Sequence, residues 1–150
     1  MPAAPAPGIT VLHCINALTD VAAFALHSTE NARIHAVKLP CSGMTRDIFL
    51  LKAFEVGADA VVLFTCPEGA CRHLDGNIRA WKRVERVRGI LDEIGLSSRR
   101  LSAFSIAPGD QEAVSLALRK VVSELAVLGP NPAARACPEI TSGLTSATTS

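Results

Sequence analysis

Short apolar runs alternate along the chain with longer segments in which apolar residues recur at helical spacing. The runs at residues 9–12, 34–39, 60–64 and 101–107 predict four strands, because they are rich in apolar and β-branched residues. The run at 60–64 is apolar throughout, which is typical of a strand buried on both faces of a parallel sheet. Helices are expected after these strands, over residues 20–30, 45–56, 77–94 and 111–128.

The longest of these segments, 77–94, predicts an amphipathic helix with one buried stripe. Asp75 is expected to cap its N-terminus, and Gly95 follows its C-terminal end. The expected stripe consists of Ile78, Trp81, Val84, Val87, Ile90, Leu91 and Ile94. Strands that alternate with helices predict a single α/β domain: a four-stranded parallel sheet with helices on both faces, in a flavodoxin-like or Rossmann-like three-layer arrangement.

The composition changes along the chain and suggests where this domain begins and ends. Residues 1–8 are rich in proline and alanine and predict a flexible lead, whereas residues 9–129 carry all the predicted elements. Residues 130–150 are dominated by Pro, Ala, Ser and Thr and predict a disordered tail, in which Cys137 is a bystander. Of the whole chain, 49% is hydrophobic but only 4% aromatic, so the core should be aliphatic.

Charge and hydropathy exclude several classes of function. The formal net charge of +1 gives no support for binding to nucleic acid or to a membrane surface. No apolar run is long enough to span a bilayer, and the N-terminus lacks the features of a signal peptide, which predicts a cytoplasmic protein. In that compartment the five cysteines are better explained by metal or redox chemistry than by a disulfide framework.

Four of the cysteines follow the predicted strands. Cys14 follows the first strand, Cys41 the second, and Cys66 and Cys71 the third. Gly69, between the last two, allows a tight loop that brings both sulfurs to one place. Because the carboxyl ends of parallel strands meet at one edge, where open α/β sheets bind ligands, the four thiols should gather there.

Several chemistries fit four gathered thiols. Four thiolates can hold a 2Fe-2S or 4Fe-4S cluster, or a structural zinc ion. Zinc ribbons usually present short Cys-x-x-Cys knuckles, which this chain lacks, so a cluster is favoured. The same lack counts against a thiol–disulfide enzyme that uses Cys66 and Cys71. Cys14 alone would also suit a small buried apolar position.

Other polar residues leave alternatives open. His13 and His73 are candidate additional ligands, whereas His27 and His35 are expected on the surface. A row of cations on the 77–94 helix predicts either a solvated face or a docking surface for an acidic redox partner. This row consists of Arg79, Lys82, Arg83, Arg86 and Arg88. No Gly-rich phosphate loop follows the first strand, so no motif supports nucleotide or flavin binding.

Several short motifs resemble the small iron-sulfur (delta) subunit of methyl-viologen-reducing hydrogenases, a domain that also occurs with heterodisulfide reductase. The matching pieces are Pro40-Cys41-Ser42-Gly43, Leu51-Lys52-Ala53-Phe54, Gly57-Ala58-Asp59, the Cys66-x4-Cys71 loop and Asp75-Gly76-Asn77. Weaker similarity extends the resemblance over most of residues 9–129. It implies a one-domain α/β protein that passes electrons between larger flavoprotein or iron-sulfur subunits of a hetero-oligomeric oxidoreductase complex.

The resemblance also implies a cofactor and its ligands. A 2Fe-2S cluster would be held by Cys14, Cys41, Cys66 and Cys71, all of which match family cysteines. The family's first-strand Cys-Cys-x-x-Cys motif is altered, because His13 and Ala17 replace two of its cysteines. The alternative is therefore an adaptor or scaffold module that kept the fold and lost the cluster.

Overall fold

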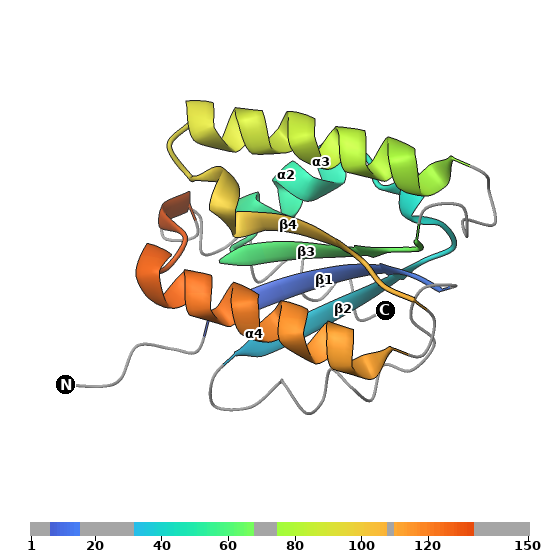
Figure 1. The fold of residues 1–150 in the computed structure, drawn as a ribbon. Coiled ribbons are helices and arrows are strands. Elements are labelled where there is room, and N and C mark those ends of the chain that lie inside the picture. Colours follow the sequence, from blue (N-terminus) through green and yellow to red (C-terminus); the bar gives the residue numbers. More distant parts are fainter. Residues whose placement is uncertain (1–6, 16–31, 68–74, 108–109, 134–150) are drawn as a thin grey trace.

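The computed structural model describes residues 7–15, 32–67, 75–107 and 110–133. Within them a four-stranded parallel sheet lies between helices, with α2 and α3 on one face and α4 on the other (Figure 1). The predicted three-layer α/β fold is confirmed. The helix expected at residues 20–30 lies outside the described residues.

The strands fall where the apolar runs predicted them. They are β1 (Gly8–Cys14), β2 (Arg33–Leu39), β3 (Ala60–Thr65) and β4 (Leu101–Ser105). Their order is β2-β1-β3-β4, and every neighbouring pair is parallel. In the register Cys14 lies opposite Leu39 of β2, and His13 lies opposite Phe64 of β3. The carboxyl ends of β2, β1 and β3 therefore meet at one edge of the sheet.

The helices begin and end close to the predicted positions. They are the 3₁₀ turn η1 (Ser42–Met44), α2 (Asp47–Glu55), α3 (Gly76–Glu93), the 3₁₀ turn η2 (Ser98–Arg100) and α4 (Gln111–Leu128). The helix expected from residue 45 begins at Asp47, because the chain after Cys41 first forms η1. Cys41 is the N-terminal cap of that turn, so one of the candidate ligands also starts an element of the fold.

Two hydrophobic cores lie on the two faces of the sheet. All six residues of β3 are buried, which confirms that this strand is covered on both sides. Because successive strand residues point to opposite faces, Val62 and Phe64 contribute to the core under α4, whereas Val61 and Leu63 contribute to the core under α2 and α3. The second core continues into α2 and α3 through Leu50, Phe54, Ala80, Val84, Val87 and Leu91.

The buried stripe of α3 differs from the predicted one. Ile78, Trp81 and Ile94 are exposed to between 38% and 61%, whereas Ala80 is fully buried. Ala80 lies on the same side of α3 as Val84, Val87 and Leu91. With 3.6 residues per turn, Ile78, Trp81 and Ile94 fall beside this buried stripe and not within it. Asp75 makes no capping hydrogen bond; its carboxylate pairs with Arg79 at 3.1 Å instead. Asp75 therefore occupies the predicted N-cap position of α3, but its side chain does not cap the helix.

A polar network closes the amino ends of the strands. The buried carboxylate of Asp59 accepts hydrogen bonds from the backbone N–H groups of Gly8 at 2.8 Å and Asn131 at 2.7 Å. The buried Arg100 guanidinium donates to the backbone carbonyls of Asp59, Leu96, Leu128, Gly129 and Pro130. Burial lowers the pKa of Arg100, and the charge of Asp59 opposes that shift. The packed domain thus includes Asn131, which lies within the tail predicted from composition.

Candidate metal centre

Three cysteines lie at the carboxyl ends of three neighbouring strands. Cys14 ends β1, Cys41 follows β2, and Cys66 follows β3. The chain passes from β1 to β2 on one side and later to β3 and β4 on the other, so the strand order reverses between β1 and β3. Cys14 and Cys66 flank this reversal, which is where open α/β sheets usually bind their ligands.

The sulfurs of Cys14 and Cys66 lie 3.7 Å apart, and both side chains are buried. Two thiolates that bind one tetrahedral metal at bond lengths near 2.3 Å are separated by about 3.8 Å. The spacing of the pair thus suits two ligands of a single metal ion, and it equally suits a hydrogen bond from the Cys66 thiol to the Cys14 sulfur. The Cys14 Sγ also lies 4.0 Å from the carbonyl oxygen of Pro40, which brings it next to the segment that carries Cys41.

Cys41 is held by the turn that it begins. Its side chain is buried, and its Sγ accepts a hydrogen bond from the backbone N–H of Gly43 at 3.3 Å. Hydrogen bonds from backbone N–H groups to sulfur are among the features that tune metal–thiolate centres. Cys41 thus has the kind of hydrogen-bond partner expected of a thiolate ligand.

The fourth predicted ligand, Cys71, lies outside the described residues, as does His73. Within the described ranges, no three Cys, His, Asp or Glu side chains are arranged to hold a metal ion. The described part of the chain supplies a close thiol pair and a third cysteine on the adjacent strand. Thiols are the type of ligand that a thiolate-bound metal or cluster uses. The common iron-sulfur centres need four of them.

His13 is buried but belongs to the other face of the sheet. It shares the alternation of Ile9 and Val11, which pack under α4, whereas Cys14 shares that of Leu12, which packs under α2 and α3. The side chains of two successive strand residues cannot point to the same face. Alternation along β1 therefore separates His13 from Cys14, but a site at the strand ends can draw on both faces, because Cys66 is in phase with Val62 and Phe64 and still contacts Cys14.

The first turns of α3 contact both cysteine-bearing loops. The amide nitrogen of Asn77 donates to the carbonyl oxygens of Cys66 at 3.2 Å and Pro67 at 3.1 Å. Farther along the helix, Arg83 Nη1 donates to the carbonyl oxygens of Gly43 at 2.6 Å and Thr45 at 2.7 Å. Sequence reasoning missed these contacts, although both residues lie in segments that resemble the family.

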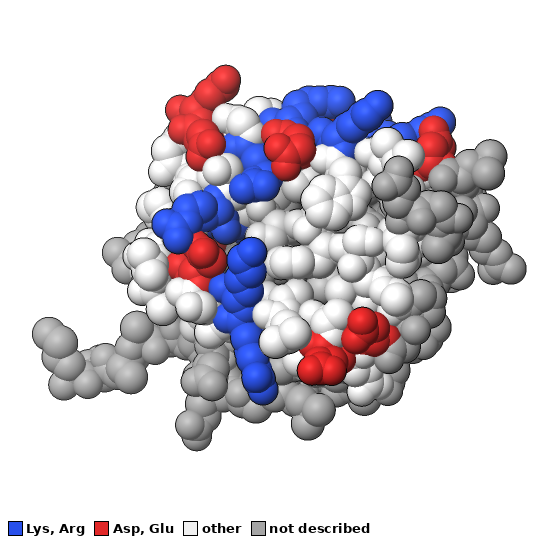
Figure 2. Space-filling view, viewed as in Figure 1, with Lys and Arg blue, Asp and Glu red and all other residues white. Residues whose placement is uncertain are grey.

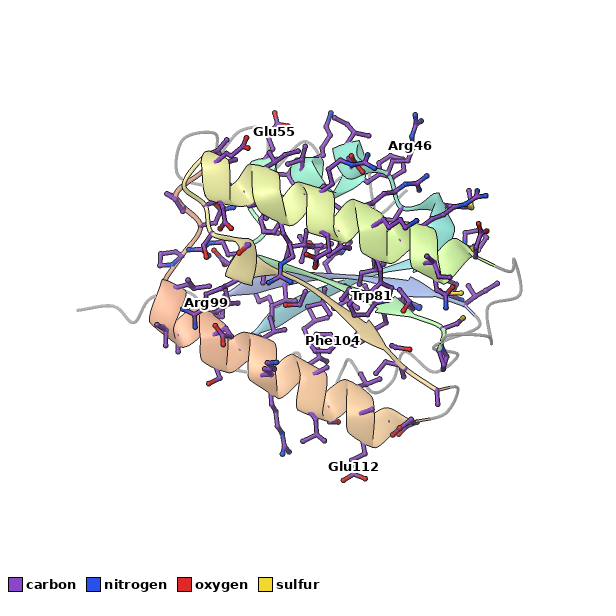
Figure 3. All side chains as sticks on the ribbon, turned by 45° about the horizontal axis from the view of Figure 1, so that its top comes forward. Arg46, Glu55, Trp81, Arg99, Phe104 and Glu112 are labelled. Atoms are coloured by element: carbon purple, nitrogen blue, oxygen red, sulfur yellow. The ribbon has the colours of Figure 1, made fainter. Side chains whose placement is uncertain are left out.

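Trp81, between them, projects from α3 toward the sheet (Figure 3). Its indole N–H donates to the Thr65 hydroxyl at 3.1 Å, one residue before Cys66. The strand end that delivers Cys66 is therefore also bound to α3.

The cations of α3 are mostly engaged within the chain. Arg79 pairs with Asp75, Arg86 with Asp47, and Arg88 with Glu85. Arg83 binds backbone carbonyls, so four of the five cations in the predicted row have partners among the described residues. Acidic side chains are interspersed with the basic ones over α3 (Figure 2). A solvated face with local ion pairs describes this surface better than a uniformly positive docking surface.

Fold and site together define a single parallel α/β domain with cysteines converging on the carboxyl edge of its sheet. The chain belongs to the family described as methyl-viologen-reducing hydrogenase, delta subunit (FlpD), whose model matches residues 9–129. No helix in the described part of the chain combines the length and apolar character needed to cross a membrane.

Curated relatives include subunits of two kinds of complex. The iron-sulfur subunit of the F420-non-reducing hydrogenase vhu from Methanocaldococcus jannaschii is 33% identical over 101 residues, which cover 67% of this chain and 75% of that protein. Its counterpart in Methanococcus maripaludis is 34% identical over the same length. Similarity to a subunit of the ferredoxin:CoB-CoM heterodisulfide reductase from Methanosarcina mazei, at 31% identity, covers 78% of this chain but only 15% of that protein.

Proposed function

We propose that this chain is an electron-transfer subunit that carries a 2Fe-2S cluster and relays electrons between larger redox subunits of an oxidoreductase complex. The observation that carries the proposal is the buried Cys14–Cys66 sulfur pair at 3.7 Å, at the strand-order reversal of the sheet. Relatives named as iron-sulfur subunits of a hydrogenase support an iron-sulfur centre in this chain.

The cluster would be held by Cys14, Cys41, Cys66 and Cys71. When bound, it would supply the capacity to take up and release one electron at a time. The chain's own residues bury the sulfurs of Cys14, Cys41 and Cys66 and thereby limit the access of water. The Gly43 N–H group would stabilise negative charge on the Cys41 sulfur, which contributes to the reduction potential of such centres.

The altered first-strand motif is compatible with this ligand set. His13 is not among the four proposed ligands, and it alternates with Cys14 along β1. The replacement at position 13 therefore removes no ligand from the proposed four. Ala17 lies outside the described residues.

The partners are proposed to be flavoprotein or iron-sulfur subunits in a cytoplasmic hetero-oligomer. The similarity to 15% of the Methanosarcina mazei heterodisulfide reductase chain supports this, because a comparable segment there forms part of a much longer protein. A domain that occurs both alone and within a larger redox protein is suited to working beside other redox centres.

Two alternatives are tested by the same experiment. A scaffold module would keep the fold without the cluster. A thiol–disulfide protein that uses Cys66 and Cys71 is the second alternative. Cys14 with Cys66 is a further candidate pair for such a protein, because these two sulfurs are in contact.

Anaerobic purification with iron and sulfide analysis, followed by EPR spectroscopy after dithionite reduction, tests the proposal. We expect about two irons and two sulfides per chain and a reducible 2Fe-2S signal. Cys14→Ser and Cys66→Ser should lose them, whereas the matched control Cys137→Ser should not. Iron-free protein that takes up no cluster on reconstitution would leave the scaffold function. A reversible Cys14–Cys66 disulfide in such protein would favour the thiol–disulfide function.

A further inference from the structure

We infer that Asn77 and Arg83 are positioning residues, through which α3 fixes the relative position of the Cys41 and Cys66 loops. The inference depends on the proposed function only for the identity of the group that the two loops would bind, the 2Fe-2S cluster. Neither residue is proposed to contact the cluster.

The sheet alone does not fix these two cysteines. β2 ends at Leu39 and β3 at Thr65, so Cys41 and Cys66 lie just beyond the hydrogen-bonded ladders. Cys14, in contrast, is paired in register within β1. The distance between ligands on the loops and on β1 must therefore be set by contacts from outside the sheet.

Asn77 supplies such a contact to the Cys66 loop. Its side chain is buried, and its amide group donates both to Cys66 and to Pro67, while its Oδ1 accepts from the backbone N–H of Ile78. An amide nitrogen has two hydrogens, so its donor capacity is fully used by two consecutive carbonyls. This arrangement fixes the direction of the chain immediately after β3.

Arg83 supplies the corresponding contact to the Cys41 loop. Its two short hydrogen bonds to Gly43 and Thr45 hold the end of the η1 turn that Cys41 begins. A charged donor makes these bonds stronger than neutral ones. Since Asn77 and Arg83 lie on the same helix, both loops are bound to one rigid element.

The chain contains a matched control for Asn77. Asn131 is also buried, and its amide nitrogen also donates to two backbone carbonyls, those of Phe54 at 2.9 Å and Ala58 at 2.7 Å. It lies in the network at the amino ends of the strands, opposite the cysteines. Asn→Asp removes the same donor group at either position, but at opposite ends of the sheet. At position 131 the new carboxylate also lies in a residue whose backbone N–H binds the buried Asp59, which adds to the expected loss of stability there.

The test compares Asn77→Asp with Asn131→Asp in reduced, metal-free protein. Diamide accepts the two electrons and two protons of a thiol pair, and mapping of peptides by mass spectrometry follows formation of the Cys14–Cys66 disulfide. Because Asn77→Asp releases the chain after β3 from α3 and Cys66 is then less often held beside Cys14, we expect this variant to react more slowly, by about tenfold or less. Asn131→Asp should lower the melting temperature and leave the rate unchanged. Equal rates in the two variants would overturn the inference.

Arg83→Met provides a second variant in case Asn77→Asp does not fold. It keeps the aliphatic stem but removes the donors, and we expect Cys41 to be alkylated several-fold faster than in the wild type. Arg86→Met is its control, because Arg86 pairs with Asp47 at the surface. Unchanged alkylation of Cys41 in Arg83→Met would count against the inference.

Cluster-loaded protein separates this inference from the proposed function. If the wild type holds a cluster, Asn77→Asp should change its EPR spectrum or potential, and Asn131→Asp should not. If the wild type holds none, the proposed function fails, but the thiol reactions still test how α3 positions the loops.

Discussion

Gly43 and Gly76 are in such close contact that a β-carbon built on Gly43 would lie 2.8 Å from the Cα of Gly76. Real β-carbons essentially never approach backbone so closely, so neither loop nor helix leaves room for a side chain at Gly43. The contact joins the Pro40–Gly43 segment to the first residue of α3. Two motifs separated in the sequence are therefore parts of one structural unit.

Gly43→Ala should push the Cys41 loop away from α3. We expect a loss of roughly 1–3 kcal/mol in the free energy of unfolding, which is the usual cost of inserting a methyl group into a packed region. Urea denaturation measures it, and alkylation of Cys41 should be faster in the folded protein.

Gly89→Ala is the matched control for Gly43→Ala. Nothing lies within 4 Å of a β-carbon at Gly89, in the interior of α3, so this change should stabilise the helix by about 0.5–1 kcal/mol. If Gly43→Ala were as stable as the wild type, the proposed rigidity of the contact would be wrong.

His13→Cys tests the assignment of His13 to the face opposite Cys14. Because position 13 alternates with Cys14 along β1, we expect a cysteine there to add no ligand to the site. We expect unchanged iron content and an unchanged EPR spectrum in the reduced protein. His13→Asn serves as the control for the effect of losing the buried imidazole alone. A new EPR signal in His13→Cys but not in His13→Asn would show that position 13 reaches the site.

Much of this arrangement follows from the pattern of apolar residues. The sequence contains four apolar runs typical of strands, and cysteines follow three of them. This pattern predicts a parallel sheet with thiols at one edge. The partners of Asn77 and Arg83 could not be predicted in this way, because both donate to backbone carbonyls that carry no sequence signal. Arg83 in particular lies 38 and 40 residues from its two acceptors and resembles an ordinary solvated cation of an exposed helix face.

The exposed apolar residues of α3 illustrate a second limit. Ile78 and Trp81 fit a helical stripe by spacing, yet both are partly exposed. Their angular position lies beside the buried line through Ala80 and Val84, and only the packing of the helix on the sheet decides which line is covered. Trp81 also makes a polar contact, because its indole N–H donates a hydrogen bond to the Thr65 hydroxyl.

Arg100→Met should strongly destabilise the fold without altering the cysteine site. It leaves the backbone carbonyls that Arg100 contacts without their donor, so we expect a loss of more than about 3 kcal/mol in the free energy of unfolding. Arg99→Met is the control, because Arg99 pairs with Glu124 at the surface and should contribute less than about 1 kcal/mol. Similar losses in the two variants would contradict the role of Arg100.

The contribution of Arg100 should not depend on pH near neutrality. Burial lowers its pKa, so the folded state binds this proton less tightly than the unfolded state does. The resulting cost to stability is present below the folded pKa and is relieved only as the pH rises through it, in the alkaline range of an arginine. Urea denaturation of wild type and Arg100→Met between about pH 6 and 8 should therefore give a constant difference in stability.

Removal of the proposed cluster should make the Cys14–Cys66 pair sensitive to oxidation. The same two sulfurs cannot be both ligands and a disulfide, so protein with a bound cluster should resist diamide, whereas chelated protein should form the disulfide. Because a disulfide requires the sulfurs to approach to about 2.05 Å, the reaction also measures how far β1 and β3 can move together at their carboxyl ends. Peptide mapping identifies the bond, and Cys14→Ser provides protein that cannot form it. Equal resistance before and after metal removal would mean that Cys14 and Cys66 do not share a metal site.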